Sequence, residues 1–112
     1  MPYNEKIADK IRGALMDVKN LTEKKMFGGI AFMINDKMCV GVVKDEMMCR
    51  INPEMDEVVL EMNDCRAMDF TGKRMKSYVF VSEEGMETKK SFDYWINLCL
   101  EFNVLAKASK KN

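Results

Sequence analysis

Two apolar stretches that flank an Asn-Asp pair constrain the fold of this chain more than any other feature. Residues 30–34 read IAFMI, residues 37–43 read KMCVGVV, and Asn35-Asp36 lies between them. Asparagine and aspartate tolerate positive φ, so a two-residue hairpin turn is favoured at this point. The pattern therefore predicts two antiparallel strands that pair directly.

A second turn extends this hairpin. Lys44-Asp45 is followed by EMMCRI, residues 46–51, which continues the apolar pattern. Residues 22–27 add a further strand or the start of a bent one. We therefore expect a meander of three or four antiparallel strands.

Helix signals lie on both sides of the meander. Asn4 can cap a helix over residues 4–18, where the apolar residues follow a spacing of 3.6. Asn52-Pro53 starts a short helix over 53–61, since asparagine caps and proline fits the first helical position. Thr88 or Ser91 starts a long helix over 88–107.

Two more strands, 65–70 and 76–81, are expected around Thr71-Gly72. The predicted order is α-β(3 or 4)-α-β(2)-α. This order is typical of the α+β class, with helices packed against an antiparallel sheet.

Strict alternation from the two turns assigns side chains to the two faces of the sheet. It pairs Phe32 with Cys39 and places Arg50 on the second face. The predicted core face carries Ala31, Met33, Met38, Val40, Val42, Met47, Cys49 and Ile51. The predicted second face carries Ile30, Phe32, Ile34, Cys39, Gly41, Val43, Met48 and Arg50. Because the second face is also mostly apolar, either helices cover both faces or the second face meets a partner, such as another copy of the chain.

The composition excludes several classes of function. We expect one domain, residues 1–112, with 107–112 as a frayed polar tail. The 18 basic and 18 acidic residues give zero net charge, which counts against a dedicated nucleic-acid binder. The chain has no histidine, the commonest general base and metal ligand, so the familiar catalytic triads are excluded. No metal site or cofactor is predicted.

The cellular location is predicted from the N-terminal residues, the length of the apolar runs and the spacing of the cysteines. The first residues, MPYNEKIADK, contain no apolar signal region, and no apolar run reaches the roughly 18 residues of a membrane span. The four cysteines are scattered and fit reduced thiols in a core. We expect a cytoplasmic protein that does not contact membranes.

Three segments together resemble a known family. They are TEKKMFGGIAFMINDKMCVGV (22–42), MMCRINPE (47–54) and MDFTGKRMKSYVFV (68–81). These segments resemble the TfoX/Sxy N-terminal domain, which is named after bacterial regulators of natural competence. The resemblance implies a small α+β fold similar to secretion-chaperone-like domains, whose members often dimerise. The competence regulators carry a further helical domain, whereas this chain stops at Asn112, so the resemblance implies a stand-alone, single-domain member without assigned catalytic residues.

Gly28-Gly29 is the first candidate site. Its backbone N–H groups could hold an anion beside Lys24 and Lys25. A phosphate loop, however, needs fixed glycine spacing and a following helix, whereas here a strand follows. A bend or bulge in the sheet is therefore the favoured interpretation.

Basic side chains form the second candidate, a nucleic-acid patch. Lys73, Arg74 and Lys76 lie in or beside a turn and could join Lys24 and Lys25. Phe27 and Tyr78 could supply faces on which bases stack. A solvated charged surface is the alternative.

Arg50 is the third candidate, because an arginine on an apolar sheet face beside Phe32 needs an acceptor. That acceptor is either a structural carboxylate, Asp69 or Glu54, or an anionic ligand or partner.

Three functions follow from these candidates. The favoured one is a non-enzymatic regulatory interaction module that binds a protein or itself through a sheet face or dimer surface. The second is a nucleic-acid-binding regulator, and the third is a small-molecule binder or enzyme with a cleft near Arg50.

Overall fold

The computed structural model describes residues 3–26, 28–62, 64–70 and 73–106, and for residues 68–70 and 73–76 the backbone alone. Its elements are α1 (Glu5–Ala14), β1 (Leu21–Met26), β2 (Gly29–Ile34), β3 (Lys37–Val43), β4 (Glu46–Arg50), the 3₁₀ turn η1 (Pro53–Met55), α2 (Asp56–Leu60), β5 (Cys65–Phe70), β6 (Lys73–Val81), the 3₁₀ turn η2 (Glu83–Met86) and α3 (Lys89–Leu105). The strands form one antiparallel sheet in the order β1-β2-β3-β4-β6-β5. The predicted α+β class is confirmed, with four strands before α2.

The predicted caps are present at the starts of α1, η1 and α3, whereas α2 begins after η1 without a side-chain cap. The Asn4 side chain accepts hydrogen bonds from the N–H groups of Lys6 and Ile7, at 2.8 and 3.3 Å. The Asn52 side chain accepts from the N–H of Glu54 at 2.9 Å, and Thr88 accepts from the N–H of Ser91 at 3.0 Å. Each cap satisfies backbone donors that the first helical turn leaves without partners.

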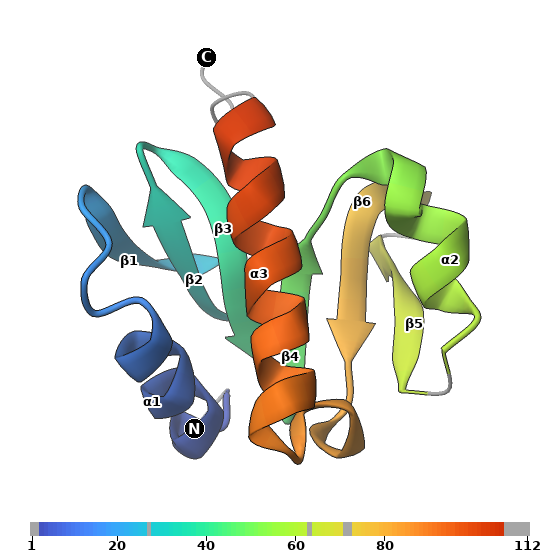
Figure 1. Ribbon diagram of the computed structural model, residues 1–112, viewed down its shortest axis with the longest axis horizontal. Helices are drawn as coiled ribbons and strands as arrows, with labels where there is room; N and C mark the ends of the chain where they lie inside the picture. Colours follow the sequence, from blue (N-terminus) through green and yellow to red (C-terminus); the bar gives the residue numbers. More distant parts are fainter. Residues whose placement is uncertain (1–2, 27, 63, 71–72, 107–112) are drawn as a thin grey trace.

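Helix α3 lies across the middle of the sheet (Figure 1). It packs on β3 and β4, whereas α2 packs on β5 and β6. Buried side chains of all three helices belong to one cluster with the facing side chains of the sheet. We call this cluster the helical core. Its helical members include Ile7, Ile11, Val59, Phe92, Trp95, Ile96 and Cys99.

The predicted Asn35-Asp36 turn is present, with φ values of 55° and 65° and Ile34 paired with Lys37. The register beyond it differs from the prediction. A bulge at Cys39 inserts one extra residue into β3, so Phe32 pairs with Val40 rather than with Cys39. The predicted pairing of Phe32 with Cys39 was wrong because strict alternation leaves no room for a bulge.

The bulge exchanges the two faces of β2, because paired residues point to the same side of a sheet. Phe32 lies in the helical core and is fully buried, although alternation placed it on the second face. The other residues whose predicted face was wrong are Ile30, Ile34 and Cys39, which lie in the helical core, and Ala31, Met33 and Met38, which lie on the second face. The predictions for Val42, Met47 and Met48 were correct, since these residues follow the bulge.

The second face carries its own buried cluster, whose described members all lie on strands. Its members are Ala31, Met33, Met38, Met48 and Phe80, each at most 5% exposed, and Met26, Val43 and Tyr78 pack against them. The guanidinium of Arg66 lies 4.7 Å from the centre of the Phe80 ring and is held by Glu46 at 2.9 Å. These side chains are therefore already buried within a single chain.

Three predicted features lie outside the described residues: Phe27, the Thr71-Gly72 turn and the tail 107–112.

Candidate functional site

The two glycines of the Gly28-Gly29 pair have different structural roles between β1 and β2. Gly28 has a φ of +78°, which favours glycine, and Gly29 pairs with Met26 as β2 begins. A Cβ atom on Gly29 would lie 1.9 Å from the carbonyl oxygen of Val42. Gly28 therefore allows the turn between the strands, and Gly29 allows the close contact with β3. A strand follows the pair, as expected.

The predicted basic residues are distributed over distant positions in the strand order. Lys24 and Lys25 are exposed on β1, an edge strand. The backbone positions of Lys73, Arg74 and Lys76 lie on β6, which β2, β3 and β4 separate from β1 in the sheet order; their side chains are outside the described set. A single patch that joins the two groups stays a prediction.

Arg50 lies half-buried between two aromatic rings. Its guanidinium carbon is 5.6 Å from the centre of the Tyr78 ring and 5.7 Å from that of Phe102. Its Nη1 donates to the carbonyl oxygen of Met38 at 3.5 Å. These contacts join β3, β4, β6 and α3, so they give Arg50 and Tyr78 a packing role.

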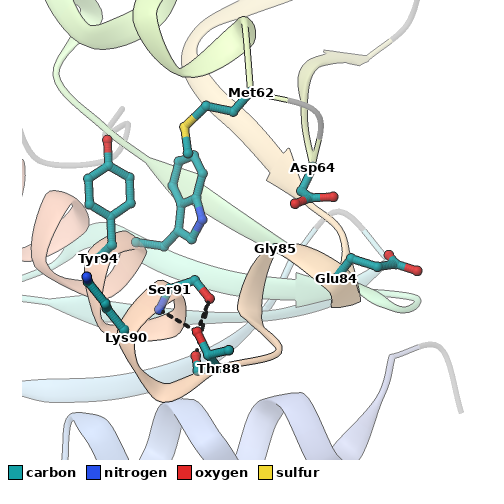
Figure 2. A pocket seen from close by; sticks show the side chains of 9 residues that line it. Met62, Asp64, Glu84, Gly85, Thr88, Lys90, Ser91 and Tyr94 are labelled. Atoms are coloured by element: carbon teal, nitrogen blue, oxygen red, sulfur yellow. Dashed lines mark hydrogen bonds between the residues drawn. The ribbon is translucent and has the colours of Figure 1, made fainter.

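A hollow of about 350 Å³ lies beside the first half of α3. Figure 2 shows Met62 and Tyr94 at one end of it and the carboxylates of Asp64 and Glu84 at the other. Its remaining lining residues are Gly85, Thr88, Lys90, Ser91 and Trp95. The Tyr94 and Trp95 rings meet edge to face at 5.2 Å, which fixes an aromatic wall.

A second hollow of about 240 Å³ lies beside the other half of α3. Its lining residues are Asn52, Met55, Leu98, Glu101, Phe102 and Leu105. Along α3, Ser91, Tyr94, Leu98 and Leu105 recur at helical spacing and so share one side of the helix. The segment 52–62 runs along that same side in the opposite direction, since Asn52 and Met55 lie near the end of α3 and Met62 lies near its start.

The two hollows lie one after the other along the same side of α3, and we call them together the α2–α3 groove. It lies between α3 and the segment that carries α2, and these two helices pack on different pairs of strands. Met62 and Leu105 remain 41% and 69% exposed there, and Tyr94 38%. Large apolar side chains that stay this exposed along one groove are typical of an interaction site.

Carboxylates border the groove. Residues 52–64 contain Glu54, Asp56, Glu57, Glu61 and Asp64 and no lysine or arginine. Residues 82–88 add Glu83, Glu84 and Glu87, again without a base. Lys89 and Lys90 follow, but Lys89 is held by Asp93 at 2.7 Å. In a chain of zero net charge, this side of the molecule is acidic.

The hydroxyl groups of Thr88 and Ser91 in the groove have structural partners. Thr88 Oγ1 caps α3 and lies 2.6 Å from Ser91 Oγ (Figure 2). With no histidine in the chain, neither hydroxyl has the usual activating base. Within the described parts of the chain, no three Cys, Asp or Glu residues are grouped to hold a metal ion.

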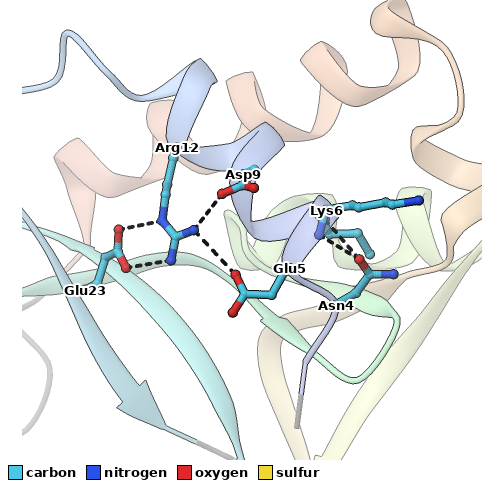
Figure 3. Close-up of polar contacts among 7 residues, drawn as sticks. Asn4, Glu5, Lys6, Asp9, Arg12 and Glu23 are labelled. Carbon is cyan, nitrogen blue, oxygen red and sulfur yellow. Dashed lines mark hydrogen bonds and ion pairs between the residues drawn. The ribbon is translucent and has the colours of Figure 1, made fainter. Parts of the chain in front are cut away.

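Four groups with shifted pKa values lie outside the polar lining of the groove. Hydrogen bonds from Arg12 lower the pKa of Glu23, and hydrogen bonds to Glu23 and Asp9 raise that of Arg12 (Figure 3). Burial raises the pKa of Cys39 and, together with a hydrogen bond to Cys49, that of Cys99. These thiols are protonated at neutral pH and are poor nucleophiles.

Sequence reasoning named none of the groove residues as a site. Two signals were available: the run of acids without a base in 52–64, and the exposed apolar residues at helical spacing on α3.

Comparison with known proteins now adds the family. The family model of the TfoX N-terminal domain matches residues 14–103, from the end of α1 to near the end of α3. No curated protein and no solved structure matches the chain, so the implied likeness to secretion-chaperone-like domains stays a prediction. None of the described helices is long and apolar enough to cross a membrane. Because the family model covers most of its length, the chain belongs to the TfoX N-terminal domain family.

Proposed function

We propose that the chain is a cytoplasmic, non-enzymatic regulatory module that binds a partner protein in the α2–α3 groove. Family membership supports a regulatory or interaction module in general terms. The observation that carries the specific proposal is the groove itself: two hollows in line, with Met62, Tyr94 and Leu105 exposed along them.

This proposal moves the binding surface from the sheet to the helices. A partner cannot reach the second face while Met33, Met38 and Phe80 are buried by the chain itself. The same holds for Phe32, which lies inside the helical core. The groove, in contrast, presents apolar surface that the fold leaves open.

The test uses site-specific photo-crosslinking in cells that express the chain. A photoreactive phenylalanine analogue replaces Tyr94, and in a control variant it replaces Lys25 on β1. We expect a discrete protein adduct from position 94 that position 25 does not form and that Leu105→Glu abolishes. No adduct from position 94, or the same adducts from both positions, would contradict the proposal.

The nucleic-acid alternative makes a different prediction. Binding through Lys24 and Lys25 would give a mobility shift that weakens steeply with salt and that Lys24→Ala and Lys25→Ala reduce. The absence of a shift at low salt would eliminate this alternative and leave the groove proposal intact.

A further inference from the structure

We propose that the α2–α3 groove receives a basic amphipathic helix of its partner protein. This inference rests on the proposed function and names the chemistry of the partner.

The length of the groove fits a helix. The stripe on α3 runs from Ser91 to Leu105, about 21 Å at 1.5 Å per residue, or about four helical turns. Anchors of an incoming helix at i, i+4 and i+11 match the spacing of Tyr94, Leu98 and Leu105, and Met62 lies beside Tyr94 at the first anchor.

The walls of the groove favour a helix over an extended segment. The α3 wall, from Lys90 to Leu105, consists of helical residues, whose backbone N–H and C=O groups bond within their own helix. An extended segment in this position would find no strand edge to pair with. A helix, in contrast, forms its backbone hydrogen bonds internally, so it can bind here through apolar side-chain contacts.

The charges around the groove specify a basic partner. Asp64 and Glu84 line the first hollow and Glu101 lines the second, while Glu54, Glu57 and Glu61 are exposed on and beside α2. Lys90 is the base that lines the first hollow. Lysine and arginine side chains at the borders of an apolar stripe would meet these carboxylates and speed association at low salt.

The same charges argue against a second copy of this chain in the groove. A symmetric dimer would place the acidic border against itself, and like charges across an interface are unfavourable. The described part of the chain also offers no basic helix, because the outer face of α1 mixes Glu5, Lys6 and Asp9.

The experiment uses defined peptides and the full-length chain. A 16-residue Leu/Lys peptide with leucines at helical spacing is titrated calorimetrically at about 50 mM salt. Two further peptides serve as controls: one with the same composition but with leucines spread around the helix, and one with Glu in place of Lys. We expect the first peptide to bind at least about tenfold more tightly than either control, with affinity that falls as salt rises.

Paired variants locate the binding. Tyr94→Ser and Glu84→Lys should each raise the Kd of the Leu/Lys peptide about five- to tenfold. Their matched controls are Met16→Ser and Asp17→Lys, which change an exposed apolar and an exposed acidic residue elsewhere and should leave the Kd within about twofold. Circular dichroism checks that each variant is folded. If Tyr94→Ser does not fold, Glu84→Lys alone provides the test.

The inference is overturned if the Leu/Lys peptide does not bind at 1 mM, if the three peptides bind equally, or if the groove variants match their controls. Its failure can be separated from that of the proposed function. If a partner crosslinks through position 94 but the Leu/Lys peptide does not bind, the groove remains a binding site and the basic helix is rejected.

Discussion

The guanidinium of Arg12 binds both carboxylate oxygens of Glu23, with Nε–Oε2 at 2.9 Å and Nη2–Oε1 at 3.0 Å (Figure 3). Asp9 accepts a further hydrogen bond from Nη1 of Arg12 at 2.7 Å. This arrangement ties α1 to the edge strand β1. The family match begins at residue 14, so the tie connects most of α1, which lies before the matched segment, to the matched fold.

Glu23→Gln should lower the free energy of unfolding by about 0.5–1 kcal/mol at pH 7, a small value because both side chains are over one-third exposed. The pKa of Glu23 is lowered in the folded state, so its contribution is present above the ordinary glutamate pKa and is lost as the pH falls through the folded value. Urea denaturation of both proteins at pH 7 and pH 3 measures this. The difference should shrink at pH 3; a difference that persists there would show that the ion pair is not its cause.

Gly29→Ala and Gly13→Ala form a matched pair that tests the close approach at the start of β2. A Cβ at position 29 would clash with the backbone of Val42, whereas a Cβ at position 13 in α1 meets nothing within 4 Å. Gly29→Ala should destabilise the fold by more than about 2 kcal/mol, and Gly13→Ala should stabilise it by about 0.5–1 kcal/mol. Thermal unfolding monitored by circular dichroism compares them. Equal stability of the two variants would contradict the role assigned to Gly29.

The cysteines should resist modification in the native protein. All four are buried, and the pKa values of Cys39 and Cys99 are raised, so the reactive thiolate is scarce at neutral pH. A thiol reagent at pH 7.5 should label the chain at the rate of unfolding and label four thiols at once in urea. Above the pKa of an unfolded thiol, the unfolded chain loses thiol protons that the folded chain keeps. The free energy of unfolding should therefore also fall above about pH 9. Rapid labelling of one native cysteine would contradict this packing.

Local signals in the sequence predicted much of the fold. Asn35-Asp36 marks its hairpin because these residue types adopt positive φ, and Asn4, Asn52 and Thr88 mark helix starts because each can bond to nearby N–H groups. Such signals act over a few residues, so a single sequence reveals them. The element order followed from them.

The faces of β2 could not be predicted in the same way. The bulge at Cys39 leaves no mark in a stretch where every residue is apolar, and alternation carries no information when both faces are buried. The groove was missed for a related reason. The groove depends on which strands α2 and α3 pack against, and the sequence pattern of neither helix specifies those strands.

The central claim is that the α2–α3 groove is the binding surface, and an amide NMR footprint tests it most directly. The ¹⁵N-labelled chain is titrated with the Leu/Lys peptide, and shift changes are mapped along the sequence. We predict that the largest changes fall within residues 52–64 and 84–105, on both walls of the groove. Largest changes on β1, at Leu21–Met26, or spread evenly over the acidic and basic surface would contradict it.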